Sequence, residues 1–148
     1  MTTIASEIRS VPRILAVLVA LATVFGALLA DFVIPVSAAQ HIRNDAWPPH
    51  AKFHDAQYII MSILLGVVAL TLLVYRGGGS RSRVRTACAI LAAPWLGLLG
   101  AFLFPGTAVE DPQFDNATIA GLHPQVLLAV ILLTLLVFAV VTNRPDEE

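Results

Sequence analysis

The sequence predicts an all-α integral membrane protein built as a bundle of four bilayer-spanning helices. The 148 residues are 57% hydrophobic and 13% charged, the mean hydropathy is +0.81, and four apolar runs are separated by polar segments. Soluble domains carry roughly 25% charged residues. Because an apolar medium cannot hydrogen-bond an exposed backbone, such runs must be helical. The length suits one domain, which we expect to cover residues 1–148.

The first predicted helix covers residues 14–39 and contains one acid, Asp31. Two arginines precede it, and the small residues at 36–38 resemble a signal-peptide cleavage site. The uninterrupted apolar part, Ile14 to Ala30, has 17 residues. Secretory signals usually have an apolar region of about 7 to 15 residues. We therefore expect this segment to be a retained membrane helix.

Three further runs approach the roughly 20 residues that cross a bilayer core. They predict helices at about 49–75, 86–104 and 124–141. Two of them start at a proline, Pro49 or Pro124, and proline suits the first turn of a helix because its missing N–H costs nothing there.

Basic residues predict the orientation, because Lys and Arg in short loops stay on the cytoplasmic side. Arg43 and Lys52 lie on one side of the predicted bundle. The other side has the remaining arginines, at positions 9, 13, 76, 81, 83, 85 and 144. We therefore expect both termini in the cytoplasm, with "RGGGSRSRVR" at 76–85 as a flexible turn. The Ala/Leu/Val-rich composition favours a bacterial cytoplasmic membrane.

A polar cluster, "DAWPPHAKFHDAQ" at 45–57, lies where the outer loop becomes the second helix. His50, His54, Gln57 and Met61 follow one another at spacings of four, three and four. At 100° per residue these side chains form one stripe on the helix. Since polar groups in membrane helices face the bundle interior or a watery cavity, we expect this stripe to point inward.

Asp31 is the most informative single residue, because an ionised carboxylate in a membrane helix costs at least about 2.5 kcal/mol. Pro35 follows four residues later and cannot donate the helical hydrogen bond to the carbonyl of residue 31. An acid and a freed carbonyl at one level are typical of a ligand pocket. The alternative is that Asp31 pairs with Arg43 or a histidine and only holds the bundle together.

These patterns predict an acid–base site of Asp31, His50 and His54 on the outer side of the membrane. The residues expected to surround a ligand there are His41, Asn44, Trp47, Gln57, Met61 and His123. The alternative for the two histidines of the second helix is structural, as hydrogen-bond partners of neighbouring helices.

Two histidines at i and i+4 can also share a metal ion, so His50 and His54 are candidate ligands for Zn or Cu. No Glu stands between them in a catalytic place. Further ligands would come from His41, His123, Asp31 or the acids between 110 and 115. No cofactor is firmly indicated.

The run "HIRNDAWPPHAKFHDAQ" at 41–57 resembles a motif, N-x-x-W-P-P-H-A-[KR]-F-H, of uncharacterised small bacterial four-helix membrane proteins. That resemblance implies a fold and no activity. The chain is more distantly similar to the EXPERA group, which includes the emopamil-binding protein and the sigma-2 receptor. This likeness implies intramembrane acids around a cavity for hydrophobic molecules, with Asp31 as one acid. The second helix offers histidines where a second membrane carboxylate is wanted.

The sequence thus predicts a membrane protein whose outer polar pocket binds a hydrophobic small molecule or lipid, with isomerase-like acid–base chemistry as an extension. One alternative is a non-catalytic accessory subunit of a larger membrane complex, and another is a metal-binding membrane protein. The expected partners are the lipid bilayer, the hydrophobic ligand and, in the first alternative, other membrane subunits. We expect no nucleic acid partner.

Overall fold

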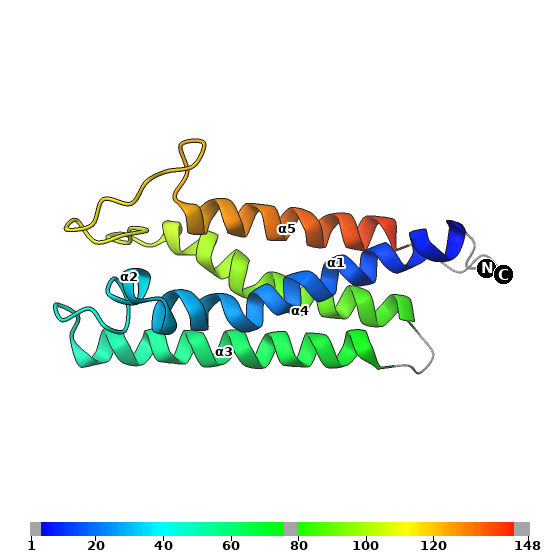
Figure 1. Ribbon diagram of the computed structural model, residues 1–148, viewed down its shortest axis with the longest axis horizontal. Coiled ribbons are helices and arrows are strands. Elements are labelled where there is room, and N and C mark those ends of the chain that lie inside the picture. The colour runs from blue at the N-terminus through cyan, green and yellow to red at the C-terminus, as the bar shows by residue number, and fades with distance from the viewer. Residues whose placement is uncertain (1–3, 76–79, 144–148) are drawn as a thin grey trace.

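Four long helices lie side by side in the computed structural model, which describes residues 4–75 and 80–143 (Figure 1). They are α1 (Ile4–Ala27), α3 (Pro49–Val74), α4 (Ser80–Gly100) and α5 (Pro124–Thr142). Three short elements lie between the long helices in the chain. The π-helix η1 (Leu28–Val33) and the helix α2 (Pro35–Ala38) follow α1, and the 3-10 helix η2 (Ala101–Leu103) follows α4. The described ranges contain no strand. The predicted all-α class is therefore confirmed.

Each long helix can cross a bilayer by its length and composition. The four candidate spans in the described residues are Val11–Val33, Pro49–Val74, Arg81–Leu103 and Pro124–Thr142, with lengths of 23, 26, 23 and 19 residues. Large apolar side chains such as Leu18, Leu64 and Val137 lie exposed on the outside of the bundle. In a bilayer, lipid would cover these side chains.

Two segments differ from the sequence prediction. The first helix is not continuous over 14–39, because the chain leaves helical geometry at Ile34, where ψ is 115°, before Pro35 starts α2. A residue that precedes proline disfavours the helical region. The predicted turn at 76–85 is also shorter, since α4 begins at Ser80 and includes three of its arginines. Residues 76–79 and Arg144 lie outside the described residues.

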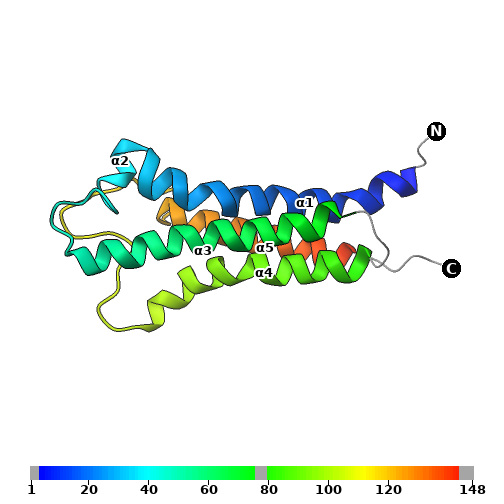
Figure 2. The same ribbon diagram turned by 90° about the horizontal axis from the view of Figure 1, so that it is seen from below.

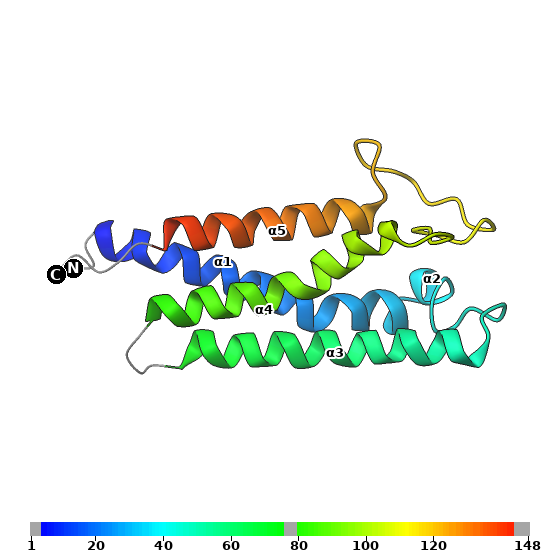
Figure 3. The same ribbon diagram turned by 180° about the vertical axis from the view of Figure 1, so that it is seen from behind.

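The helices form a ring in which α1 and α4 each pack against both α3 and α5. α1 also contacts α4 across the ring, whereas α3 and α5 do not touch within the described chain. α2 and the segment 104–123 lie at one end of the bundle, which we name the loop end, and the described ends of α1 and α5 lie at the opposite, termini end (Figures 1 and 3).

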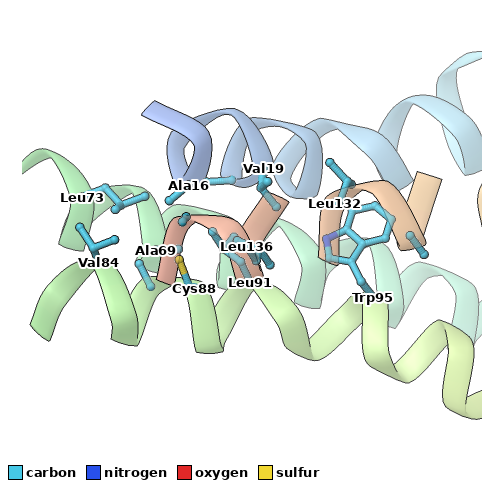
Figure 4. Close-up of a cluster of buried hydrophobic side chains, with 14 residues drawn as sticks. Ala16, Val19, Ala69, Leu73, Val84, Cys88, Leu91, Trp95, Leu132 and Leu136 are labelled. Carbon is cyan, nitrogen blue, oxygen red and sulfur yellow. The ribbon is translucent and has the colours of Figure 1, made fainter. Parts of the chain in front are cut away.

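The hydrophobic core occupies the half of the bundle toward the termini end (Figure 4). Small and branched side chains fill it, among them Ala16, Val19 and Leu91. At Gly66 a Cβ would lie 2.5 Å from Val24 Cγ2 and 3.1 Å from the carbonyl oxygen of Ala20. Glycine therefore allows α1 and α3 to approach closely, as small residues do in membrane bundles.

Toward the loop end the packing opens. α4 contains Pro94, and a proline inside a helix removes one backbone hydrogen bond and kinks the helix. Toward the loop end α4 runs away from α3, as two perpendicular views show (Figures 1 and 2). The loop-end half of the bundle is thus wider between α3 and α4 than the termini-end half.

Candidate functional site

Asp31 lies in η1 and is only 4% exposed, in the loop-end half of the bundle. The N–H of Ile34 donates to the carbonyl of Leu29 at 2.8 Å, which is the i to i+5 spacing of a π-helix. In that register the residue that should donate its N–H to the Ala30 carbonyl is Pro35, which has no N–H. The hydroxyl of Ser37 donates to the Ala30 carbonyl instead. The lost bond that we predicted at residue 31 by α-helical counting therefore moves to Ala30, where a side chain replaces it.

The His41 side chain faces the Asp31 carboxylate. Its Nε2 lies 3.5 Å from Asp31 Oδ1, and its Nδ1 lies 2.8 Å from the carbonyl oxygen of Ser37. Because a carbonyl oxygen can only accept, Nδ1 must carry a hydrogen. The Nε2 atom is then the one that faces the carboxylate. The pairing with a histidine, which the sequence left as an alternative to Arg43, is the one present.

Asp55 on α3 is a second carboxylate in this cluster, and we did not include it in the predicted site. Asp55 lies close enough to Asp31 for the two carboxylates to interact electrostatically, and His41 interacts electrostatically with both of them. The Tyr58 side chain, about one turn further along α3, also interacts electrostatically with both carboxylates. One oxygen of Asp55, Oδ2, is buried without a hydrogen-bond partner in the described part of the chain.

A sequence signal for Asp55 does exist. Buried Ile59, Ser62, Gly66 and Ala69 recur along α3 at spacings of three, four and three. Small residues on one face of a membrane helix mark its contact with a neighbour. Extending that face by four residues toward the start of the helix reaches Asp55. This pattern would have identified the inward face.

The predicted inward stripe is wrong for His50, His54 and Gln57, which are exposed. Met61 is also exposed, but it lines a cavity between α3 and α4. Asp55 follows His54 directly, and one residue turns the helix by 100°. Since the small residues of α3 pack against α1, the histidines point away from the bundle. Their Nε2 atoms lie 3.1 Å apart, and His54 Nδ1 lies 3.2 Å from the Gln57 side-chain oxygen.

A metal at His50 and His54 stays a prediction. In residues 4–75 and 80–143, no three His, Cys, Asp or Glu side chains are grouped so that they could hold a metal ion. Asp31 and His41 face the inside of the bundle, whereas His50 and His54 are exposed on its outside, so the first two do not join the last two as ligands.

A cavity of about 500 Å³ lies against Asp31 at the loop end. Trp95 forms part of its wall and is held there by a hydrogen bond of 3.1 Å from its Nε1 to Thr23 Oγ1. His123 accepts a hydrogen bond from the N–H of Gln125 and so caps α5 at the cavity rim. The other lining residues are Gly26, Ala27, Ala30, Ser37, Gln40, His41, Tyr58, Asn116, Ala117, Pro124 and Leu128.

Two loop segments are tied together over this end of the bundle. Trp47 Nε1 donates to Asp111 Oδ2 at 2.9 Å, and buried Asn44 donates to the same oxygen at 3.3 Å. Gln40 and Asn116 exchange two amide hydrogen bonds of 2.9 and 2.7 Å. Of the predicted ligand-binding residues, His41 and His123 line the large cavity, whereas Asn44 and Trp47 position the loops beside it.

Four apolar helices around a loop-end cavity with buried acids define a multi-pass helical membrane protein. The chain belongs to DUF6640, a family of unknown function, whose model matches residues 14–145. No curated protein and no solved structure matches the chain.

Proposed function

We propose that the protein binds one hydrophobic small molecule or lipid in the 500 Å³ cavity, with the polar end of that molecule at Asp31 and His41. The observation that carries this proposal is the buried Asp31 carboxylate beside the partly buried His41 imidazole in a largely apolar cavity wall. Small-molecule sites are mostly apolar, with a few convergent polar groups that fix orientation. An intramembrane acid is a functional residue by default, because keeping it there is costly.

Proton transfer is the chemistry that this pair supports. A carboxyl group and an imidazole that face each other can give a proton to a bound ligand or take one from it, provided the ligand lies within about 3 Å. Asp55 adds a second carboxylate, which agrees with the EXPERA resemblance better than the histidines of α3 do. The proposed roles are Asp31 as acid or base and His41 as its proton partner, with His50 and His54 outside the site.

We also propose that the loop end faces away from the cytoplasm. Arg13, Arg81, Arg83 and Arg85 lie toward the termini end, and Arg43 and Lys52 lie toward the loop end. Positive charge favours the cytoplasmic side.

Mass spectrometry of molecules that co-purify with the protein tests the binding proposal. We expect a hydrophobic molecule with wild type and its loss with Asp31→Asn, which keeps the size of the side chain. Asp45→Asn is the matched control, because Asp45 is an exposed loop acid. No enrichment in wild type over the detergent blank, or equal enrichment in all three proteins, would contradict the proposal.

Incubation of that co-purified molecule with the protein in D₂O tests the acid–base step. If Asp31 removes a proton from carbon and returns one, the molecule gains deuterium. We expect no gain with His41→Ala. A ligand that stays unlabelled with wild type would restrict the protein to binding.

A further inference from the structure

A second cavity of about 410 Å³ lies between α3 and α4 and is lined almost wholly by apolar groups. Tyr58 and Gln125 line both this cavity and the one at Asp31, so the two adjoin. The remaining lining residues are Met61, Ser62, Leu65, Ala93, Pro94, Gly97, Leu98 and Ala101. We name this cavity the α3–α4 groove.

The groove exists because of two residues in α4. Pro94 lies inside α4 and lines the groove, and α4 diverges from α3 toward the loop end (Figures 1 and 2). Gly97, one turn later, has no side chain, and a Cβ there would meet nothing within 4 Å. Met61 on the opposite wall is 49% exposed. The groove therefore opens sideways, at a level of α3 and α4 that lies within their membrane spans.

A smaller cavity of about 240 Å³ continues from the same point toward the loops. Its wall is mixed, with His41, Glu110 and Asp111 among apolar side chains such as Phe102, and Gln125 lines it as well. Gln125 thus lines all three cavities: the apolar α3–α4 groove, the Asp31 cavity and this smaller cavity, which is the most polar of the three. An apolar groove that adjoins cavities with polar side chains suits a molecule with a long hydrocarbon chain and a polar end.

We propose that the α3–α4 groove is the lateral entrance for the ligand and the subsite that holds its chain. The ligand class is then an amphiphile with a linear hydrocarbon chain, taken from the bilayer and oriented with its polar end toward Asp31 and His41. This inference rests on the proposed binding function and specifies its route and ligand class.

A photoreactive fatty acid with a diazirine in its chain tests the inference, with the protein reconstituted in phosphatidylcholine vesicles. Irradiation followed by peptide mass spectrometry maps the labelled residues. In wild type we expect labels on the groove wall, at Met61 and Leu65, and inside the bundle, at Trp95. Gly97→Leu adds a side chain to the groove wall, at a position where a Cβ meets nothing within 4 Å, and should remove the interior labels. Gly100→Leu is the matched control, since a Cβ there also meets nothing within 4 Å and Gly100 does not line the groove.

The outcomes separate the route from the binding function. Interior labelling that is lost with Gly97→Leu and kept with Gly100→Leu supports the α3–α4 entrance. Interior labelling that persists with Gly97→Leu overturns the entrance and leaves binding intact, with access by another route. No interior labelling in wild type overturns both.

A second variant guards against loss of folding in Gly97→Leu. Met61→Trp narrows the groove from α3, at a half-exposed position that tolerates bulk. If both variants elute as the wild type does in size exclusion, they should lose interior labelling alike. Retention of the label by a folded Met61→Trp protein would count against the entrance.

Discussion

The two halves of the bundle bury different chemistry. Toward the termini end the buried residues are apolar, and α1 and α3 touch backbone to backbone at Gly66. Toward the loop end Asp31, Asn44 and Ser62 are buried, and cavities separate the helices. The same four helices thus supply a packed half that holds the fold and an open half that can take a ligand. The packed half gives way to the open half near two irregular points of the helices, the π-helix η1 and the proline inside α4, Pro94.

The largest stability effect is expected in the packed half. Gly66→Ala would place a methyl group 2.5 Å from Val24 Cγ2 and against the backbone of α1. Overpacking of this kind costs about 1–3 kcal/mol. Thermal unfolding in detergent measures the change. Gly97→Ala is the control and should be neutral or slightly stabilising, because alanine favours helix. Equal effects at the two glycines would remove the contrast between the halves.

A smaller effect is expected where the loops are tied together. Trp47→Phe removes the hydrogen bond from Nε1 to Asp111 and keeps the ring. One hydrogen bond contributes about 0.5–1.5 kcal/mol. Hydrogen exchange of segment 104–123 should become faster, while α3 and α5 exchange as before. Unchanged exchange of the segment would show that this bond does not hold the loops over the cavity.

Asp31→Asn should leave stability almost unchanged. The asparagine side chain has the same size, and its amide can donate to His41 Nε2, so we expect a change below about 1 kcal/mol in the free energy of unfolding. The co-purifying molecule should nevertheless be lost. A loss of folding that accompanies the loss of ligand would assign Asp31 to holding the bundle instead.

The smallest effect is expected at the outward histidines. His54→Ala breaks only an exposed contact with His50 and Gln57, and surface substitutions usually stay within about 0.5 kcal/mol. Ligand content should match wild type. Elemental analysis of wild type and this variant, purified without chelators, checks the metal prediction in the same samples. Ligand loss in this variant would return the histidines to the site.

The fold could be predicted because the bilayer imposes simple rules of length and hydropathy. Which side chains of each helix face the bundle interior was harder to predict from the sequence. Polar character suggested that His50 and His54 face inward, yet the small residues of α3 decide which face packs, and they turn Asp55 inward. Asp31 was recognised because a lone acid in an apolar run is conspicuous. Its pairing with His41 depends on the π-helix and on α2, which local sequence rules do not predict.

An experimental structure of the protein purified from its native membrane tests the central claim most directly, through the density in the cavity beside Asp31. We predict elongated density that contacts Asp31 and His41 and continues past Gln125 into the α3–α4 groove. A cavity closed by side chains, or one that holds only water, would contradict the claim that the open half binds a hydrophobic molecule.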